Sequence, residues 1–101
     1  MFVGVARFEL FIPESSSLKT KRGVLRSVIS IARQKFNASI AEVDYQDLWQ
    51  RSAVGVSCVS DSTVHCRKML QEVERSIARS AAGAAEITAV TVDVVSLEDL
   101  M

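Results

Sequence analysis

Hydrophobic and polar residues alternate along the first part of the chain and then change to a helical period. From Phe2 to Ile12 apolar residues recur at every second position and would lie on one face of a strand, which predicts a β-strand. The strand is expected to end where Pro13 removes a backbone donor. From Leu18 to Phe36 apolar residues recur at spacings of three and four, which predicts an amphipathic helix with Ser17 as its N-cap. The chain therefore opens with a strand followed by a helix.

The same two periods recur through the rest of the chain. In the stretch after the first helix the apolar residues change phase partway, which predicts a β-bulge. The remaining predicted elements are a strand over Asn37–Tyr45, a hairpin connection over Gln46–Gln50, a strand over Arg51–Ser60, a helix from Asp61 or Ser62 to Ala82 that Gly83 ends, and a strand over Thr88–Val94.

This order of elements, βαββαβ, predicts an α+β fold. Two crossover helices packed on one face of an antiparallel four-stranded sheet give a ferredoxin-like sandwich. A chain of 101 residues fits one domain. We expect a single domain over residues 1–95 and a short acidic tail over residues 96–101.

The composition is that of an ordinary globular protein, with 49% hydrophobic and 24% charged residues. Lys and Arg total 12, as do Asp and Glu, so the net charge does not favour a polyanionic partner. A basic surface that binds a polyanion would have to be local. No apolar run is long enough to span a membrane, and the N-terminus does not resemble a signal peptide. We therefore expect a cytoplasmic protein with no membrane partner.

The segment "EVDYQDLWQRS", Glu42 to Ser52, concentrates acidic and aromatic residues and is a candidate active site. Glu42 and Asp44 are two apart and are expected on one strand face, with Asp47 in the turn beyond. Three adjacent carboxylates suit a metal ion or an acid–base pair, but no nucleophile or histidine accompanies them.

Two other interpretations of this segment are a structural hairpin and a recognition surface. In the first, Tyr45 and Trp49 bury their rings while Arg51 pairs with Asp44 or Glu42 across the hairpin. In the second, an exposed Trp49 anchors a partner. The candidate interface or hairpin residues are Glu42, Asp44, Asp47, Trp49, Gln50 and Arg51.

The segment "SSSLKTKRGVLR", Ser15 to Arg26, is basic where the helix dipole disfavours positive charge. An anion bound at the helix start, or an RNA backbone along one helix face, would compensate for this arrangement; the alternative is a solvated face. The candidate anion-binding or RNA-binding residues are Ser17, Lys19, Lys21, Arg22, Arg26 and Arg33.

Other chemistry is not indicated by the sequence. Cys58, His65 and Cys66 lack the spacing of a metal site, so we expect reduced core thiols, no metal and no cofactor. The third strand, "SAVGVSCVS", has no aromatic residue on which an RNA base could stack. The face of the sheet away from the helices is predicted to carry Val3, Val5, Phe11 and Val59, which suits pairing in a homodimer or with another protein.

Two segments resemble the YlxP-like family of small bacterial proteins of unknown function. "SLKTKR", Ser17 to Arg22, is similar to one signature of that family, and "KFNASIAEVDYQDLWQR", Lys35 to Arg51, followed by "GVSCVS", is similar to the other. The resemblance implies a ferredoxin-like fold but no activity. It also implies an association with RNA or the ribosome, because genes of the family often lie beside genes of translation and ribosome maturation.

The sequence thus favours a non-catalytic module over an enzyme. The first hypothesis is binding to an RNA backbone or a ribosomal surface through the basic helix. A homo-oligomeric adaptor that uses the open sheet face and Trp49 is one alternative. A small enzyme that acts on an anionic substrate through Glu42, Asp44 and Asp47 is the other.

Overall fold

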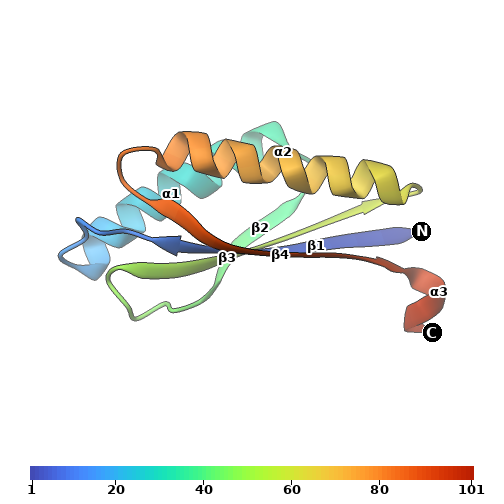
Figure 1. The fold of residues 1–101 in the computed structure, drawn as a ribbon, viewed down its shortest axis with the longest axis horizontal. Coiled ribbons are helices and arrows are strands. Elements are labelled where there is room, and N and C mark those ends of the chain that lie inside the picture. The colour runs from blue at the N-terminus through green and yellow to red at the C-terminus, as the bar shows by residue number, and fades with distance from the viewer.

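A computed structural model describes residues 1–101 and confirms the predicted ferredoxin-like α+β fold (Figure 1). The four strands form one antiparallel sheet in the order β2-β3-β1-β4. The elements are β1 (Phe2–Phe11), α1 (Leu18–Lys35), β2 (Ser39–Asp44), β3 (Arg51–Ser60), α2 (Thr63–Ala81), β4 (Glu86–Ser96) and the short α3 (Leu97–Leu100).

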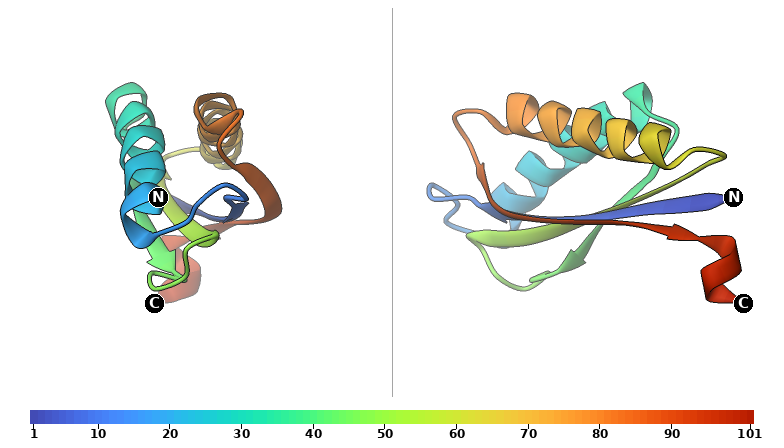
Figure 2. Two further views of the ribbon diagram at one scale, coloured as in Figure 1. Left: turned by 90° about the vertical axis from the view of Figure 1, so that its left-hand side faces the viewer. Right: turned by 45° about the vertical axis from the view of Figure 1, so that its right-hand side comes forward.

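The two long helices lie side by side on one face of the sheet and leave the other face open (Figure 2). Alternation along β1 explains this arrangement, because Ala6, Phe8 and Leu10 are buried towards the helices. Val5 and Phe11 point to the open face and are exposed. The core therefore fills the space between the sheet and the helices.

Helix α1 begins and ends close to its predicted limits. The Ser17 Oγ accepts a hydrogen bond from the Thr20 backbone N–H at 3.1 Å, which confirms the predicted N-cap. The buried face of α1 carries Leu25, Val28 and Ala32, at the spacing of a single helical stripe.

Strand β2 contains the predicted bulge and is shorter than expected. Its register with β3 shifts between Glu42 and Asp44, so that Glu42 pairs with Val54 while Asp44 pairs with Ala53. The strand ends at Asp44 because Tyr45 adopts a left-handed conformation with φ of 62°. The bulge thus places one extra residue, Val43, in β2.

Strand β4 is longer than the predicted Thr88–Val94. It pairs with β1 from Glu86 to Ser96, with one register shift. The acidic segment that follows forms α3, whose Leu97 N–H donates to the Met1 carbonyl at 2.9 Å. None of the helices combines the length and the hydropathy that a membrane span requires.

Two glycines give a direct test of this backbone. Gly23 lies inside α1 with free space around an added Cβ, whereas Gly83 follows α2 with φ of 85°. We expect Gly23→Ala to raise the free energy of unfolding by about 0.5–1 kcal/mol, because alanine favours the helix. Gly83→Ala should lower it by about 1–2 kcal/mol, because a Cβ disfavours the left-handed region. Urea denaturation measures both changes. Equal effects of the two substitutions would contradict the helical conformation of Gly23 and the left-handed conformation of Gly83.

Candidate functional site

The two unusual segments of the sequence meet at a buried ion pair between Lys21 and Glu42. The Lys21 side chain is 1% exposed, and its Nζ lies 3.0 Å from the Glu42 Oε2. The same Glu42 oxygen accepts a hydrogen bond from the buried Ser52 Oγ at 2.7 Å. Helix α1 is therefore tied to both β2 and β3 by one carboxylate.

Lys21 also bonds the backbone where β2 ends. Its Nζ donates to the Tyr45 carbonyl at 2.5 Å and to the Gln46 carbonyl at 3.4 Å. The left-handed conformation of Tyr45 costs on the order of 1–2 kcal/mol. These hydrogen bonds, and one from the Tyr45 N–H to the Asp44 Oδ1 at 2.8 Å, offset that cost.

The expectation that Lys21 faces an anion in solvent is therefore wrong. An ammonium group inside the fold needs a charge partner and hydrogen-bond acceptors, and Glu42 and the two carbonyls provide them. The sequence held a signal for this position, because Lys21 follows Leu18 by three residues and precedes Leu25 by four. It thus lies within the apolar stripe rather than beside it.

The bulge also corrects the expectation that Glu42 and Asp44 share a face. Glu42 points towards the helices and Lys21, whereas Asp44 bonds Arg7 on the open face, with 3.1 Å between the Arg7 Nη2 and the Asp44 Oδ2. No three His, Cys, Asp or Glu side chains form a group that could hold a metal ion. The carboxylates proposed for an enzyme, including that of Asp47 in the loop, are not brought together.

A cluster of charged side chains around Tyr45 occupies one end of the open face. The Tyr45 hydroxyl donates to the Glu9 Oε1 at 2.9 Å, and Arg51 stacks 4.2 Å from the centre of the Tyr45 ring. Arg51 pairs with Glu9 at 3.3 Å, so the expected pairing with Asp44 or Glu42 is wrong. Arg7 and Glu9 were not predicted as members of this cluster, because only the strand register brings them beside the hairpin.

The pKa of the Asp44 carboxyl lies below its ordinary value in this cluster. The main cause is the hydrogen bond from the Tyr45 backbone N–H, and the second is the hydrogen bond from Arg7. Asp44 is thus held ionised by its neighbours, as suits a structural acceptor rather than a proton donor.

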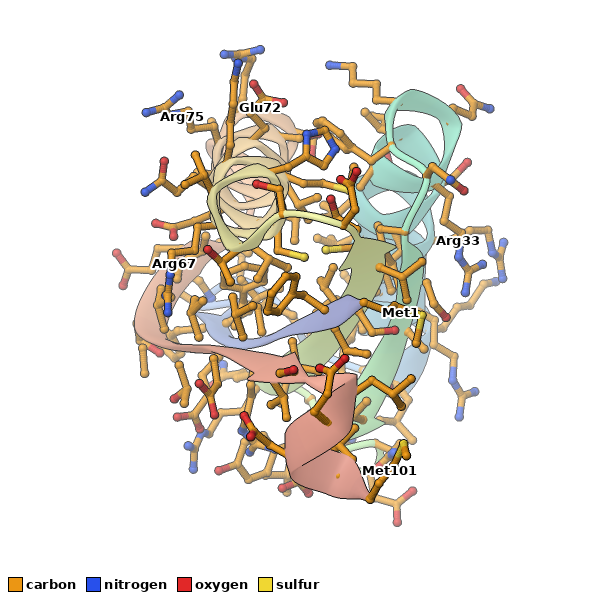
Figure 3. The ribbon with its side chains drawn as sticks, turned by 90° about the vertical axis from the view of Figure 1, so that its right-hand side faces the viewer. Met1, Arg33, Arg67, Glu72, Arg75 and Met101 are labelled. Atoms are coloured by element: carbon orange, nitrogen blue, oxygen red, sulfur yellow. The ribbon has the colours of Figure 1, made fainter.

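The basic residues of α1 other than Lys21 are exposed. Arg33 combines exposure with a hydrogen bond to the Ile40 carbonyl, at 3.0 Å from its Nε, and lies on the outer flank of α1 (Figure 3). None of the exposed residues is in an ion pair. Four of these exposed residues, Lys19, Arg22, Arg26 and Arg33, lie along one narrow face of the helix, and we call them the α1 row.

Charge is segregated between the two layers of the fold. The helices α1 and α2 contain ten of the twelve Lys and Arg residues but only two of the twelve acids, Glu72 and Glu74. The strands, loops and α3 contain the other ten acids and only Arg7 and Arg51. The neutral chain therefore has a strongly positive helical layer opposite an acidic sheet and loops.

The hairpin loop presents Trp49 to solvent rather than burying it. Its side chain is among the exposed large hydrophobic groups, at 54%. The neighbouring Gln50 fixes the loop, because its Nε2 donates to the Pro13 carbonyl at 3.0 Å and its backbone carbonyl accepts from Ile12. Asp47 is exposed in the same loop.

Comparison with known proteins places this architecture in a family. Residues 3–92 match the family described as "Protein of unknown function (DUF503)". The chain belongs to this family. It is 41% identical to the uncharacterized protein YlxP of Bacillus subtilis (strain 168), over 77% of this chain and 96% of YlxP. The resemblance inferred from the two signature segments is thereby confirmed.

Solved structures with low sequence identity share the fold. A de novo designed ferredoxin-fold protein matches with a TM-score of 0.57 and 14% identity, covering 95% of this chain and 86% of the design. A C-terminal segment of the alpha subunit of aIF2 from Pyrococcus abyssi matches with a TM-score of 0.54 and 14% identity, covering 94% of this chain and 51% of that segment. At these identities the likeness concerns the fold alone.

Removal of the Lys21 ammonium tests the buried ion pair. We expect Lys21→Met to lower the free energy of unfolding by roughly 2–4 kcal/mol, because it leaves the largely buried Glu42 carboxylate unpaired. The double variant Lys21→Met/Glu42→Gln should recover part of that loss. Lys19→Met is the matched control, since Lys19 is exposed two residues away. If urea denaturation gave the same loss in free energy of unfolding for Lys21→Met and Lys19→Met, the buried ion pair between Lys21 and Glu42 would be contradicted.

Proposed function

We propose that the protein is a non-catalytic module that binds the phosphate backbone of RNA, free or on a ribosomal surface, through its helical layer. The observation that carries this proposal is the segregation of charge, with ten of twelve basic residues on α1 and α2. A basic face on a neutral protein attracts a polyanion and orients the protein on it.

The α1 row supplies the contacts in this proposal. Its four members extend from Lys19 to Arg33, a helical rise of about 21 Å, and no acid interrupts α1. Their side chains are exposed and in no ion pair, so binding a phosphate does not require an existing ion pair to break. Lys21 is excluded from the row because Glu42 neutralises it inside the fold.

The sheet is a poor surface for RNA in comparison. Its open face carries Glu9 and Asp44 among its charged groups, and β3 has no aromatic side chain on which a base could stack. Backbone contact by the helices, without base readout, therefore fits the distribution of residues. We expect the binding to be insensitive to RNA sequence.

A second candidate function is protein binding at the open face. Val59 at 62% exposure, together with the exposed Val5 and Trp49, favours a contact with an apolar surface, in a homodimer or with another protein. Such binding would depend little on salt, so the experiment below distinguishes it from RNA binding.

Binding to ribosomal subunits and to a generic structured RNA over a salt series tests the first candidate. We expect the association constant to fall steeply with salt for the wild-type protein. The triple variant Lys19→Gln/Arg22→Gln/Arg26→Gln should keep its fold, because all three residues are exposed. It should lower the slope of log K against log salt by about 2–3 units.

Single substitutions supply the matched control. Arg22→Gln removes one charge from the helical layer, and Arg51→Gln removes one from the sheet face. The proposal requires only the first to weaken RNA binding. An RNA affinity that does not change with salt, or that falls equally with both substitutions, would contradict the assignment of RNA binding to the helical layer.

A further inference from the structure

A groove between the C-terminal end of α1 and the middle of α2 is separate from the α1 row. It has a volume of about 260 Å³ and is lined by Lys35, Phe36, Glu72, Arg75, Ser76 and Arg79. Lys35 lies about 160° around α1 from Lys19, on the flank that faces α2. Figure 3 shows Glu72 and Arg75 on the side of α2 that points away from the sheet.

The groove contains a buried hydroxyl group without a partner. Ser76 is 4% exposed, and its Oγ is the only buried side-chain nitrogen or oxygen in the chain that makes no hydrogen bond. Leaving such a group unpaired costs free energy that folding alone does not recover. A ligand in the groove that accepts a hydrogen bond would satisfy it.

The charge around this hydroxyl is positive. Lys35, Arg75 and Arg79 are exposed and in no ion pair, including with Glu72, the single acid of the lining. The lining therefore has an excess of two positive charges. Mutual repulsion among the three cations is relieved when an anion lies between them.

We propose that this groove binds a phosphate group carried as a monoester or as free phosphate. A phosphate dianion matches the excess charge of the lining, and its oxygens give each of the four donors an acceptor. The Ser76 hydroxyl donates to one oxygen, and Lys35 and the two guanidinium groups bind the others. A carboxylate carries one negative charge and would leave one of the two excess positive charges of the lining uncompensated.

Thermal unfolding in inorganic phosphate, compared with chloride at equal ionic strength, tests this site. Phosphate should raise the Tm of the wild-type protein, because it binds the folded state. Arg79→Gln should weaken phosphate binding about tenfold, through loss of a charge-assisted hydrogen bond. Ser76→Ala should also reduce the shift, although its Tm in chloride should equal or exceed that of the wild type, since it removes the unpaired hydroxyl.

Arg26→Gln is the control with the same loss of charge, because Arg26 lies in the α1 row and outside the groove. It should keep the full phosphate shift while weakening RNA binding, so this proposal and the RNA proposal fail independently. Three results would overturn the site. They are no phosphate-dependent Tm shift in the wild-type protein, a full Tm shift in Ser76→Ala, or equal reductions of the Tm shift in Arg26→Gln and Arg79→Gln.

The source of the phosphate is decided by competition. An oligonucleotide with a 5′-phosphate and the same oligonucleotide with a 5′-hydroxyl are each added to phosphate-loaded Arg26→Gln protein. Displacement by the 5′-phosphate alone assigns the groove to an RNA end, and displacement by neither assigns it to a small phosphorylated molecule. Equal displacement by both oligonucleotides would overturn recognition of a monoester.

Discussion

The ion pair between Lys21 and Glu42 is the interaction on which the arrangement of this fold depends. A lysine in the apolar stripe of α1 can be accommodated only opposite a carboxylate and free backbone carbonyls. The bulge in β2 turns Glu42 towards the helix, and the left-handed Tyr45 directs its carbonyl to the same ammonium. The bulge and the left-handed Tyr45 thus both provide oxygen atoms that contact the buried Lys21 ammonium.

The same interaction shows that some basic side chains are paired with acids inside the fold and are not free to bind a ligand. Lys21 is neutralised inside the fold, and the cluster around Tyr45 pairs Arg7 and Arg51 with acids of the sheet. The positive charges that remain unpaired lie on α1 and α2. Zero net charge therefore conceals a molecule with two electrically different faces, and the helical face is the one suited to a phosphate backbone.

Periodicity was sufficient to predict the fold, because helices and strands with one buried face repeat at 3.6 and 2 residues. It located the N-cap of α1 and the bulge, but it could not show which way the bulge turns Glu42 and Asp44. Arg7 and Glu9 were missed because strand register, a long-range property, brings them to Tyr45. Segregation of charge by layer, in contrast, could have been counted from the predicted elements, because both helices were already expected on one face of the sheet.

Mapping the RNA contact by amide chemical shifts in NMR spectra tests the central claim most directly. The account predicts that RNA perturbs the amides and side chains of Lys19, Arg22 and Arg26 on α1. The indole N–H of Trp49, the only tryptophan, should keep its position because it lies in the hairpin loop. Shifts centred on Trp49 and the open face around Val59, with α1 unchanged, would contradict the account.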